Sequence, residues 1–278
     1  MGGDNAPDAN LLGAFLAYKE LNSNEKIVLV GDEDLAHRWF SSNKIDATLF
    51  EYIHSDQVIL MNEHATKAIR KKPNNSISVG FKALKNNEID VFSSSGNSGA
   101  MLVGSMFSIG PIKGVIRPGI TSILPKENGG VGLILDVGVN ADCKPDVLFQ
   151  FAILGSLFAE NVYNIHSPKV GLLNIGEEKG KGNLLTQATY QLLEDNEDIN
   201  FIGNVEGRDL FTEKADIIVC DGFTGNVVLK LAESFYSLIK KKNFSDPYFD
   251  RFNYEIYGGT PVLAVSYTHL TLPTTSPV

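Results

Sequence analysis

The sequence predicts an α/β protein with a mostly parallel sheet and helices on both faces of that sheet. Short runs of Val, Ile and Leu end in glycine-bearing loops, and most of these loops lead into a segment of helical periodicity. The runs are nearly continuous rather than alternating, which is typical of strands buried on both faces. Strands and helices that alternate in this way form parallel sheets covered by helices.

The elements follow one another in a regular order. The expected strands are residues 26–31, 89–95, 132–138, 169–176, 200–205 and 215–222, with apolar runs such as KIVLVG, GLILDVG and ADIIVCDG. The expected helices are residues 9–21, 98–109, 146–161, 184–195 and 226–242. The last helix has the clearest apolar stripe, made of Val227, Val228, Leu231, Phe235, Leu238 and Ile239. Its final lysines place positive charge at the negative end of the helix dipole.

Composition excludes several classes of protein. The 278 residues are 43% hydrophobic and 21% charged, as in an ordinary globular chain. A formal charge of −9 argues against nucleic acid as a partner. Two cysteines without CxxC spacing argue against a disulfide framework or a four-thiolate zinc site. Neither a signal peptide nor an apolar run of about 20 residues is found, so a cytoplasmic protein is expected.

Both ends of the chain depart from the pattern of the middle. Residues 1–4 form a glycine loop that leads into a helix with no strand before it, so we expect that a first strand is missing. Residues 266–278 carry no acidic or basic side chain except His269, and they show no helical or strand period. We expect this tail to be non-native sequence; a genuine disordered tail is the alternative.

Two loops that follow expected strands share the pattern x-Gly-x-Ser/Thr-Gly. The candidate phosphate-binding residues are Ser95, Gly96, Asn97, Ser98 and Gly99 in one loop and Asp221, Gly222, Thr224 and Gly225 in the other. Glycines let a backbone approach a ligand, and the N–H groups at the start of a helix attract anions. The alternative is two tight turns with capping residues. The matched pair favours an oxyanion or phosphate cradle, to which Asn226 adds an amide.

A third glycine-rich loop, residues 176–182 (GEEKGKG), carries Lys179 and Lys181. A lysine here could neutralise a phosphate or stabilise a developing oxyanion, and solvated lysines in a loop are the alternative. We interpret Glu177 and Glu178 as solvated. None of the three loops contains a Walker A motif or a complete GxGxxG fingerprint, so no nucleotide cofactor is expected.

Other polar residues are weaker candidates. Asp136 and Asn140 follow the strand at 132–138 and could line a cleft or simply form a turn. The loop with Asn204, Glu206, Arg208 and Asp209 is interpreted as a capped helix start. Cys220 could be a nucleophile, but a small apolar residue at a strand end is favoured. The five histidines lack metal-binding spacing, so no metal site is expected.

Two surface features suggest partners. Lys67, Arg70, Lys71 and Lys72 form a basic cluster in an otherwise anionic chain. A solvated helix face is the default interpretation, and docking of an acidic carrier protein is the sharper one. Near the C-terminus, the aromatic residues Tyr248, Phe249, Phe252, Tyr254 and Tyr257 gather within ten positions. Core or dimer packing is the conservative interpretation, and contact with a membrane surface is the alternative.

Six segments together resemble the bacterial phosphate acyltransferase family (acyl-carrier-protein:phosphate acyltransferase, PlsX). They are MGGDNAP at 1–7, SGNSGA at 95–100, LDVGVN at 135–140, NIGEE at 174–178 with Lys181 and Gly182, GNVEGRD at 203–209 and DGFTGNVVLK at 221–230. They occur in the order typical of that family and extend over most of residues 1–265.

The resemblance implies transfer of a long-chain acyl group from acyl carrier protein to inorganic phosphate, giving an acyl phosphate for phospholipid synthesis. It implies one domain at 1–265 of the phosphate acetyltransferase and isopropylmalate-dehydrogenase fold, a homodimer without cofactors, and peripheral contact with the inner membrane face. By resemblance Lys181 and Asn226 are catalytic, and Gly3 and Asp4 join the loops at 95–99 and 221–225 in holding phosphate. The phosphate is itself the nucleophile, so the protein need only hold it and stabilise the thioester oxyanion.

The chain also departs from the family pattern. The first strand, the C-terminal strand and most of a helical hairpin before the YGG segment are not found in this sequence, so membrane binding is in question. The nearest rival function is a short-chain phosphate acyltransferase that uses coenzyme A. A decarboxylating dehydrogenase of the same fold would need an aspartate metal cluster and a nicotinamide site. A non-catalytic phosphate-binding scaffold is a further alternative.

Overall fold

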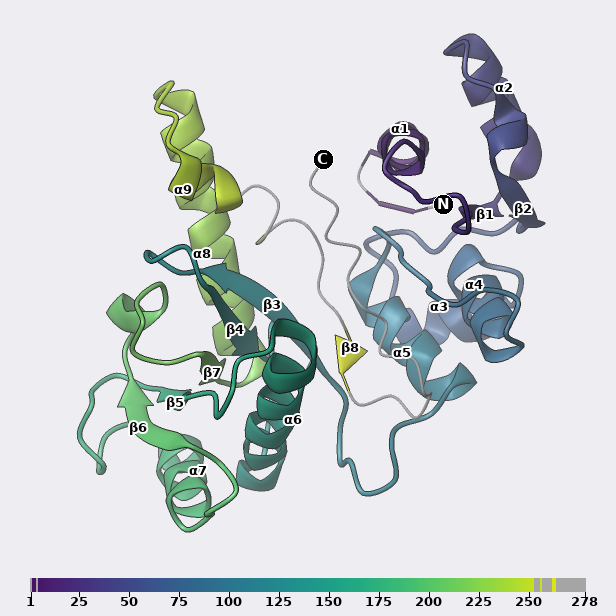
Figure 1. Cartoon of the computed structure of the whole chain (residues 1–278). Coiled ribbons are helices and arrows are strands. Elements are labelled where there is room, and N and C mark those ends of the chain that lie inside the picture. The colour runs from purple at the N-terminus through teal and green to yellow at the C-terminus, as the bar shows by residue number, and fades with distance from the viewer. Residues whose placement is uncertain (1, 4, 253–255, 257–261, 264–278) are drawn as a thin grey trace. The chain divides into compact units, whose positions relative to one another are not determined.

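The computed structural model describes residues 2, 3, 5–252, 256, 262 and 263, which fold into two compact units (Figure 1). One unit contains Met1–Ile112 and the other contains Lys113–Ala264. The expectation of a single acyltransferase domain at 1–265 stays a prediction, and the tail at 266–278 lies outside the described residues.

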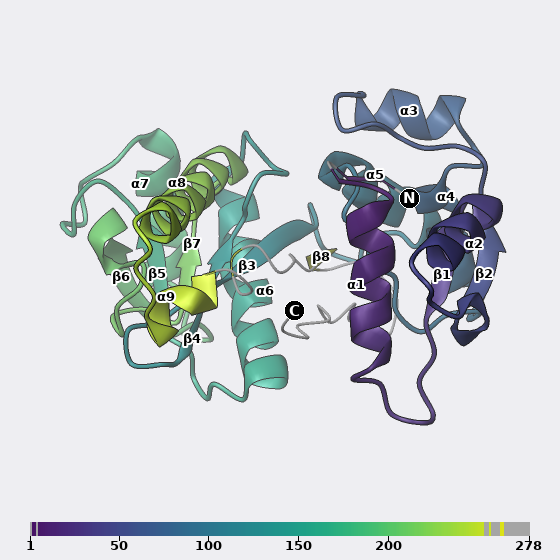
Figure 2. The ribbon, with the colours of Figure 1, turned by 90° about the horizontal axis from the view of Figure 1, so that it is seen from above.

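The first unit is mostly helical around a small sheet. Its helices are α1 (Asp8–Tyr18), α2 (Glu33–Ser42), α3 (Ala65–Lys71), α4 (Ser76–Lys85) and α5 (Ser98–Ser108), with a 3-10 turn at Ala47–Leu49. Its strands, β1 (Val28–Gly31) and β2 (Glu51–His54), form a parallel pair. One apolar cluster around Phe40 joins α1 and α2 to the sheet, and a second around Phe81 joins α3, α4 and α5. Helix α3 lies at an edge of this unit (Figure 2).

The second unit is built on a six-stranded sheet. Its strands are β3 (Gly119–Pro125), β4 (Val131–Leu135), β5 (Val170–Leu173), β6 (Phe201–Val205), β7 (Ile217–Val219) and β8 (Val262–Leu263). Its helices are α6 (Pro145–Tyr163), α7 (Leu184–Glu194), α8 (Gly222–Lys241) and α9 (Pro247–Arg251), with a 3-10 turn at Gly207–Asp209. The order across the sheet is β6-β5-β7-β4-β3-β8. Strands β6, β5, β7 and β4 are parallel, whereas β3 is antiparallel to both of its neighbours.

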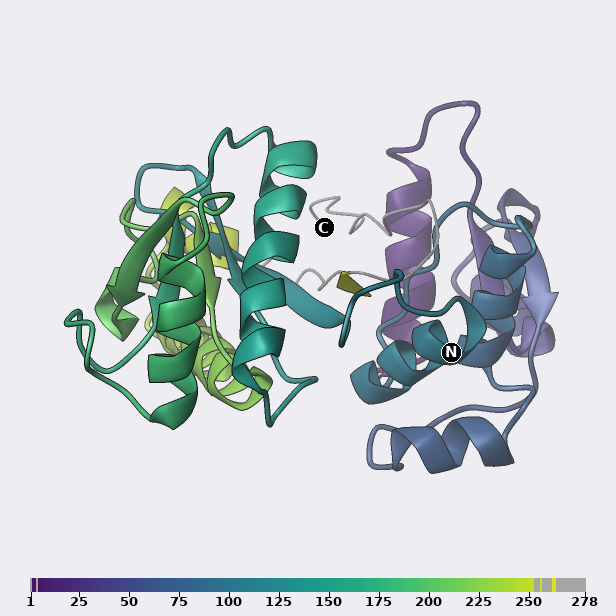
Figure 3. The same cartoon turned by 90° about the horizontal axis from the view of Figure 1, so that it is seen from below.

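Helices cover both faces of this sheet, as Figure 3 shows with α6 and α7 in front of the strands and α8 behind them. Along β4, Leu133 and Leu135 belong to the apolar cluster on the α6 and α7 face. Ile134, between them, belongs to the cluster on the α8 and α9 face. All three side chains are fully buried. The predicted fold class is therefore confirmed, and the near-continuous apolar runs are explained by burial on both faces.

The parallel part of the sheet positions the candidate site. Strands β4, β5 and β7 are neighbours with the same direction, so the loops that follow them meet at one edge of the sheet. These loops contain residues 136–140, 174–183 and 220–222, which include most of the polar candidates in the second half of the chain.

Several elements differ from the prediction. Residues 89–95 form no strand, because no neighbouring strand among the described residues pairs with them. Strands β2 and β3 were not predicted; β3 interrupts its apolar run with Thr121 and Ser122 and ends at a proline. Helix α8 begins at Gly222 rather than at 226, because the side chain of Asp221 caps it there.

Helix α8 presents its apolar stripe differently from expectation. Its buried face consists of the small residues Gly222, Gly225 and Ala232 and of two larger residues, Leu229 and Tyr236. The exposed large apolar side chains are Phe223, Val227, Leu231, Phe235 and Leu238. The stripe predicted from periodicity is thus largely exposed in this unit, since the small residues allow close packing of the opposite face on the sheet.

The aromatic cluster near the C-terminus packs into the second unit. Phe252 is buried, and Tyr248 and Phe249 pack against the apolar cluster on the α8 face. The hydroxyl of Tyr248 donates to the carbonyl of Pro125 at 3.1 Å. The interpretation as core packing is confirmed for these three residues, whereas Tyr254 and Tyr257 lie outside the described part of the chain. Among the described helices, none has the length and apolar character of a membrane span.

Candidate functional site

Asp136 is the centre of a buried hydrogen-bond cluster at the end of β4. Its Oδ1 accepts from the backbone N–H of Ile120 at 3.0 Å, and its Oδ2 accepts from the backbone N–H of Asn140 at 2.6 Å. The side-chain amide of Asn140 donates to the same carboxyl at 2.9 Å and to the carbonyl of Pro118 at 2.9 Å. Both side chains are buried, so here they hold the loop together rather than face a ligand.

The charge of Asp136 is influenced by two opposing effects. Burial raises the pKa of the carboxyl, and the hydrogen bonds from Ile120 and Asn140 oppose that rise. A carboxyl whose pKa is higher in the folded state than in the unfolded state lowers the free energy of unfolding at pH values above both pKa values. The hydrogen bonds to Asp136 reduce this loss of stability.

Three glycines allow the β4 loop and the start of α8 to pack closely. A Cβ on Gly225 would lie 1.9 Å from the carbonyl oxygen of Asp136, and one on Gly222 would lie 2.8 Å from the N atom of Asn140. Gly138 has a φ of +113°, and a Cβ there would lie 2.8 Å from Nδ2 of Asn226. These contacts fix the amide of Asn226 over the β4 loop. No hydrogen-bond partner for that amide exists among the described residues.

The N-terminus of α8 is already capped by its own residues. Oδ1 of Asp221 accepts from the backbone N–H of Thr224 at 2.9 Å, and its Oδ2 accepts from the hydroxyl of Thr224 at 2.8 Å. The N–H of Gly222 donates to the carbonyl of Asn140 at 2.8 Å. The residues of this loop therefore cap the helix, which was the alternative to a phosphate cradle. The negative charge of Asp221 also makes the N-terminus of α8 less attractive to an anion.

The loop after β5 is held by asparagines. The amide of Asn174 donates to the carbonyl of Lys181 at 3.1 Å and to Oδ1 of Asn204 at 3.0 Å. Asn204 in turn donates to the carbonyl of Glu178 at 2.9 Å. Gly182, with a φ of +97°, packs tightly against Thr186 and Asn174. This network sets the backbone of Lys181 in a defined position.

The lysines around this loop differ in their partners. Lys179 forms an ion pair with Glu194, and Lys214 pairs with Glu177 at 2.7 Å and with Asp209 at 2.8 Å. These partners explain the raised pKa of both lysines, to which the hydrogen bonds with the carboxylates contribute most. Lys181 is exposed and has no ion pair or hydrogen bond from its ammonium within the described residues. It is the lysine of this loop that is available to a ligand.

A cavity of about 410 Å³ lies between the β5 loop and the start of α8. Asn174, Gly182 and Asn183 line one side of it, and Asp221 and Thr224 line another. Lys181 and Asn226 are not among its lining residues, although each neighbours one of the loops that form it. The cavity therefore joins two of the three predicted loops within the second unit.

The loop at 95–99 belongs to the first unit, where it packs on the N-terminal glycines. The hydroxyl of Ser95 donates to the carbonyl of Gly2 at 3.1 Å, and Asn10 donates to that hydroxyl at 2.7 Å. A Cβ on Gly3 would lie 2.8 Å from the carbonyl oxygen of Ser95. The structure thus brings Gly3 together with Ser95 and Gly2 together with Gly96, while a role of these residues in phosphate binding stays a prediction. Asp4 lies outside the described residues.

Asn97 acts as a cap rather than as a free amide. Its Oδ1 accepts from the N–H of Ala100 at 2.9 Å, and its Nδ2 donates to the carbonyls of Leu60, Met61 and Glu63 at 3.1–3.2 Å. Ser98 is exposed and Gly99 packs against Ala65. Whether the loops at 95–99 and 221–225 hold one phosphate together stays a prediction, because they belong to different units.

The basic cluster lies on α3 and at its end. Lys67, Arg70 and Lys71 are exposed. Lys72 instead pairs with Glu63 at 2.6 Å and donates to the carbonyl of Val58 at 2.7 Å. Three of the four predicted docking residues are therefore accessible, while the fourth fastens α3 to the preceding loop.

The interpretation of Cys220 as a buried apolar residue is confirmed. Burial raises the pKa of its thiol well above the ordinary value, and burial also raises the pKa of Cys143 from 9.0 to about 11. The raised pKa keeps both thiols largely protonated at neutral pH, which disfavours a nucleophilic role for either. The polar loop at 204–209 likewise forms the predicted capped turn, since Glu206 and Asp209 cap each other reciprocally.

The cysteines give a first testable prediction. With a pKa of about 11, the thiolate fraction of Cys143 at pH 7.5 is about 100-fold smaller than that of an unperturbed thiol. We expect iodoacetamide to label the native protein slowly at pH 7.5 and faster as the pH rises toward 11, as followed by mass spectrometry. Rapid labelling at pH 7.5, or a labelling rate that does not change with pH, would contradict the assignment.

Some residues of the site were not predicted. Asn174 and Asn183 border the cavity. Gly138 packs against the side-chain amide of Asn226. The sequence offered a signal for Gly138, because glycine after a strand favours a left-handed turn. It offered none for Asn10, whose role depends on a contact with Ser95 85 positions away.

Comparison with known proteins extends these observations. The sequence profile described as "Fatty acid synthesis protein" matches residues 1–243. A protein from Dictyoglomus thermophilum named phosphate acyltransferase is 41% identical over 96% of this chain and 85% of its own length. One of the same name from Acetivibrio thermocellus is 47% identical over 86% of this chain and 71% of its own length.

Solved structures agree on the fold. A branched-chain phosphotransacylase from Enterococcus faecalis superposes with a TM-score of 0.59 at 16% identity, over 84% of this chain and 82% of that one. The EutD phosphotransacetylase from Staphylococcus aureus gives a TM-score of 0.58 at 15% identity, over 83% and 80% of the two chains. At such identities the likeness concerns the fold alone. The family profile and the curated relatives go further, and they show that this chain belongs to the fatty acid synthesis protein (PlsX) family of phosphate acyltransferases.

Proposed function

We propose that this phosphate acyltransferase takes a long-chain acyl group from the thioester of acyl carrier protein and transfers it to inorganic phosphate. The product is an acyl phosphate for phospholipid synthesis. The observation that carries the proposal is the ammonium of Lys181, which has no partner among the residues that the structure describes, in a loop whose other lysine is neutralised by an acidic partner. A cation in a loop that borders the cavity of about 410 Å³ suits an anionic nucleophile or a developing oxyanion.

The chemistry requires little of the protein beyond placement. A phosphate oxygen attacks the thioester carbonyl, the new C–O bond forms a tetrahedral oxyanion, and the C–S bond then breaks. The thiolate of the carrier leaves and takes up a proton. In this proposal Lys181 stabilises the negative charge on the oxyanion, and the amide of Asn226 donates a hydrogen bond to phosphate or to that oxygen. Neither role requires a protein nucleophile, in keeping with one half-buried and one buried thiol whose pKa values are both raised.

The phosphate-binding residues proposed from the sequence differ in whether their polar atoms are already used in hydrogen bonds within the protein. Gly3, Ser95 and Gly96 lie together, and Asp221 and Thr224 border the cavity. Asp136, Asn140 and Asn97 use their polar atoms within the protein. We therefore propose that these last three position the loops, while backbone N–H groups and Lys181 bind the anion.

Three further proposals concern partners and location. Lys67, Arg70 and Lys71 offer an accessible basic surface, which supports docking of an acidic carrier protein. The exposed apolar stripe of α8 supports a homodimer, because a monomer seldom leaves such a stripe in water. From the family resemblance we also propose that the protein associates peripherally with the inner face of the membrane.

The identity of the donor is tested by comparing two thioesters. Acyl-phosphate formation is measured as hydroxamate from palmitoyl carrier protein and from acetyl coenzyme A, each with saturating phosphate. We expect kcat/KM to be at least about 100-fold higher for the carrier-protein thioester, because charge steering and the acyl chain both favour it. A higher kcat/KM for acetyl coenzyme A would favour the short-chain enzyme. Phosphate binding without turnover of either donor would indicate a scaffold.

A further inference from the structure

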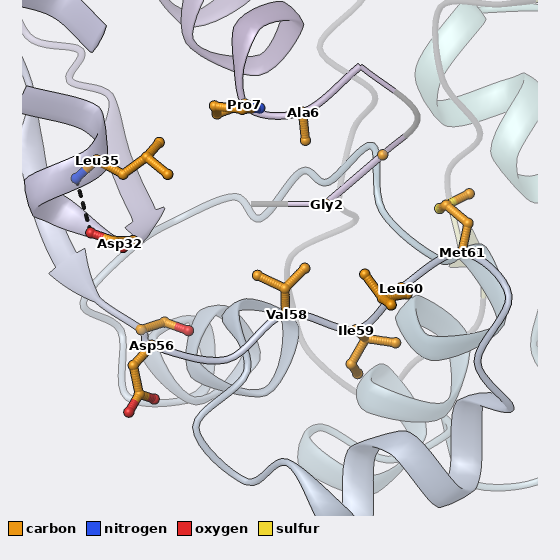
Figure 4. Close-up of a pocket in the computed structure, with 12 residues that line it drawn as sticks. Gly2, Ala6, Pro7, Asp32, Leu35, Asp56, Val58, Ile59, Leu60 and Met61 are labelled. Carbon is orange, nitrogen blue, oxygen red and sulfur yellow. Dashed lines mark hydrogen bonds between the residues drawn. The ribbon is translucent and has the colours of Figure 1, made fainter. Parts of the chain in front are cut away.

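The first unit contains a hollow of about 540 Å³, and of the described residues that line it only Gly3 has a role in the proposed function. Gly2, Gly3, Ala6 and Pro7 line one side of it, and the extended segment from Val58 to Met61 lines the opposite side (Figure 4). Its volume is within the range of small-ligand sites. We call this space the apolar hollow.

The polar groups at the rim of the apolar hollow are already engaged. Oδ1 of Asp32 accepts from the N–H of Leu35 at 2.9 Å, and the hydroxyl of Ser55 donates to the carbonyl of Asn74 at 2.7 Å. Oδ1 of Asp56 accepts from the amide of Asn74 at 2.5 Å. A ligand in the hollow would therefore gain few hydrogen bonds from these side chains, so they do not favour a polar guest.

The remaining wall is apolar and unusually exposed. Val58, Leu60 and Met61 are 39%, 56% and 46% exposed, whereas Ile59 between them is 3% exposed. The alternation follows from the extended backbone, which turns successive side chains to opposite sides. In Figure 4, Val58 and Leu60 point toward the side where Gly2 and Ala6 lie, and Ile59 points the other way into the protein. Three large apolar side chains thus face the hollow with no side chain of the described residues covering them.

Charge excludes one class of ligand. The described lining residues include the carboxylates of Asp32 and Asp56 and no lysine or arginine. A phosphate or a coenzyme A diphosphate would be repelled next to these two carboxylates, while an uncharged hydrocarbon chain would not. Such a chain would instead cover the exposed apolar wall, and each buried methylene group contributes roughly fourfold to affinity.

We propose that the apolar hollow holds the hydrocarbon chain of the long-chain acyl substrate. The inference rests on the proposed function, because that function supplies the acyl chain. Gly3 lines the hollow and also contacts Ser95, so the hollow opens beside the turn at which phosphate binding is proposed. A chain seated along Val58 and Leu60 would have its carbonyl end near that turn.

Binding is tested without catalysis by methyl-13C-methionine NMR of the whole chain. We expect 1-decanol, an uncharged chain, to shift the signal that Met61→Leu removes. The control alcohol is 1-butanol at the same concentration, and the internal control is Met106, an exposed methionine that does not line the hollow. Equal shifts of Met61 and Met106, or no shift of Met61, would overturn the proposal.

A kinetic test uses Leu60→Trp, which fills the hollow from a position that is mostly exposed and tolerant of a larger side chain. The KM for a palmitoyl donor should rise at least about tenfold, while the KM for a butyryl donor stays within about twofold. Leu12→Trp, an exposed leucine on α1 outside the hollow, is the matched control and should change neither. Unchanged KM values in Leu60→Trp would overturn the proposal. Absence of acyl-phosphate formation by the unmodified protein would instead refute the proposed function, and the NMR result would still stand.

Discussion

Lys181→Ala is expected to lower kcat for acyl-phosphate formation about 100- to 1,000-fold, the usual effect of removing one group that stabilises an oxyanion. The physical reason is that Lys181 is exposed and unpaired among the described residues, so its charge is free to act on a ligand. Little change in stability is expected, because the side chain packs no buried surface. The measurement is hydroxamate formation at saturating phosphate and thioester, with urea unfolding of the same samples.

A matched control for this variant lies two residues earlier. Lys179→Ala removes a lysine of the same loop whose charge is neutralised by Glu194, and kcat should stay within about threefold of the unmodified protein. Lys181→Arg retains the positive charge and should recover part of the activity lost in Lys181→Ala. Equal losses for positions 179 and 181, or full activity of Lys181→Ala, would remove Lys181 from the proposed machinery.

Gly225→Ala is expected to lower the free energy of unfolding by about 3 kcal/mol. The added Cβ would lie 1.9 Å from the carbonyl oxygen of Asp136, and this obstacle is backbone rather than a flexible side chain. Either α8 or the β4 loop must move, and the contact between Gly138 and Asn226 must move with it. Activity should therefore fall more than stability alone explains. Urea unfolding and acyl-phosphate formation, measured below the unfolding transition, separate the two effects.

The control for this variant is another helical glycine. Gly13 lies in α1, and a Cβ there would meet no atom within 4 Å. Gly13→Ala should raise the free energy of unfolding by about 0.5–1 kcal/mol, because alanine loses less backbone entropy in a helix. If Gly225→Ala were as stable as Gly13→Ala, the close contact between α8 and the β4 loop would be wrong.

The pattern of the chain predicted the parallel part of the sheet well. Runs such as GLILDVG and ADIIVCDG became β4 and β7, since strands buried on both faces must be apolar at every position. The run at 89–95 failed, because a strand also needs a neighbour with which to pair. The prediction that the apolar stripe of α8 is its buried face failed for a related reason. Periodicity identifies an apolar face, but the packing partner decides whether that face is covered.

For the candidate site, too, the local features could be predicted and the distant contacts could not. Glycine-rich loops after strands were recognised from local sequence, and the six family segments identified the phosphate acyltransferase family. The distant partners of Asn97, Asn10 and Asp136 could not be predicted, because they lie 37, 85 and 16 positions away along the chain. An asparagine that caps a helix and one that binds an anion have the same local sequence.

The sequence by itself determined the class of fold, the order of its glycine loops and the family, because these depend on periodicity and on short segments of adjacent residues. Tertiary structure alone decided which lysine of the β5 loop lacks a partner among the described residues, which amides are used in capping, and where the apolar hollow lies. Each of these depends on which side chains meet across the fold, and hydrogen bonds and ion pairs form only over a few ångströms.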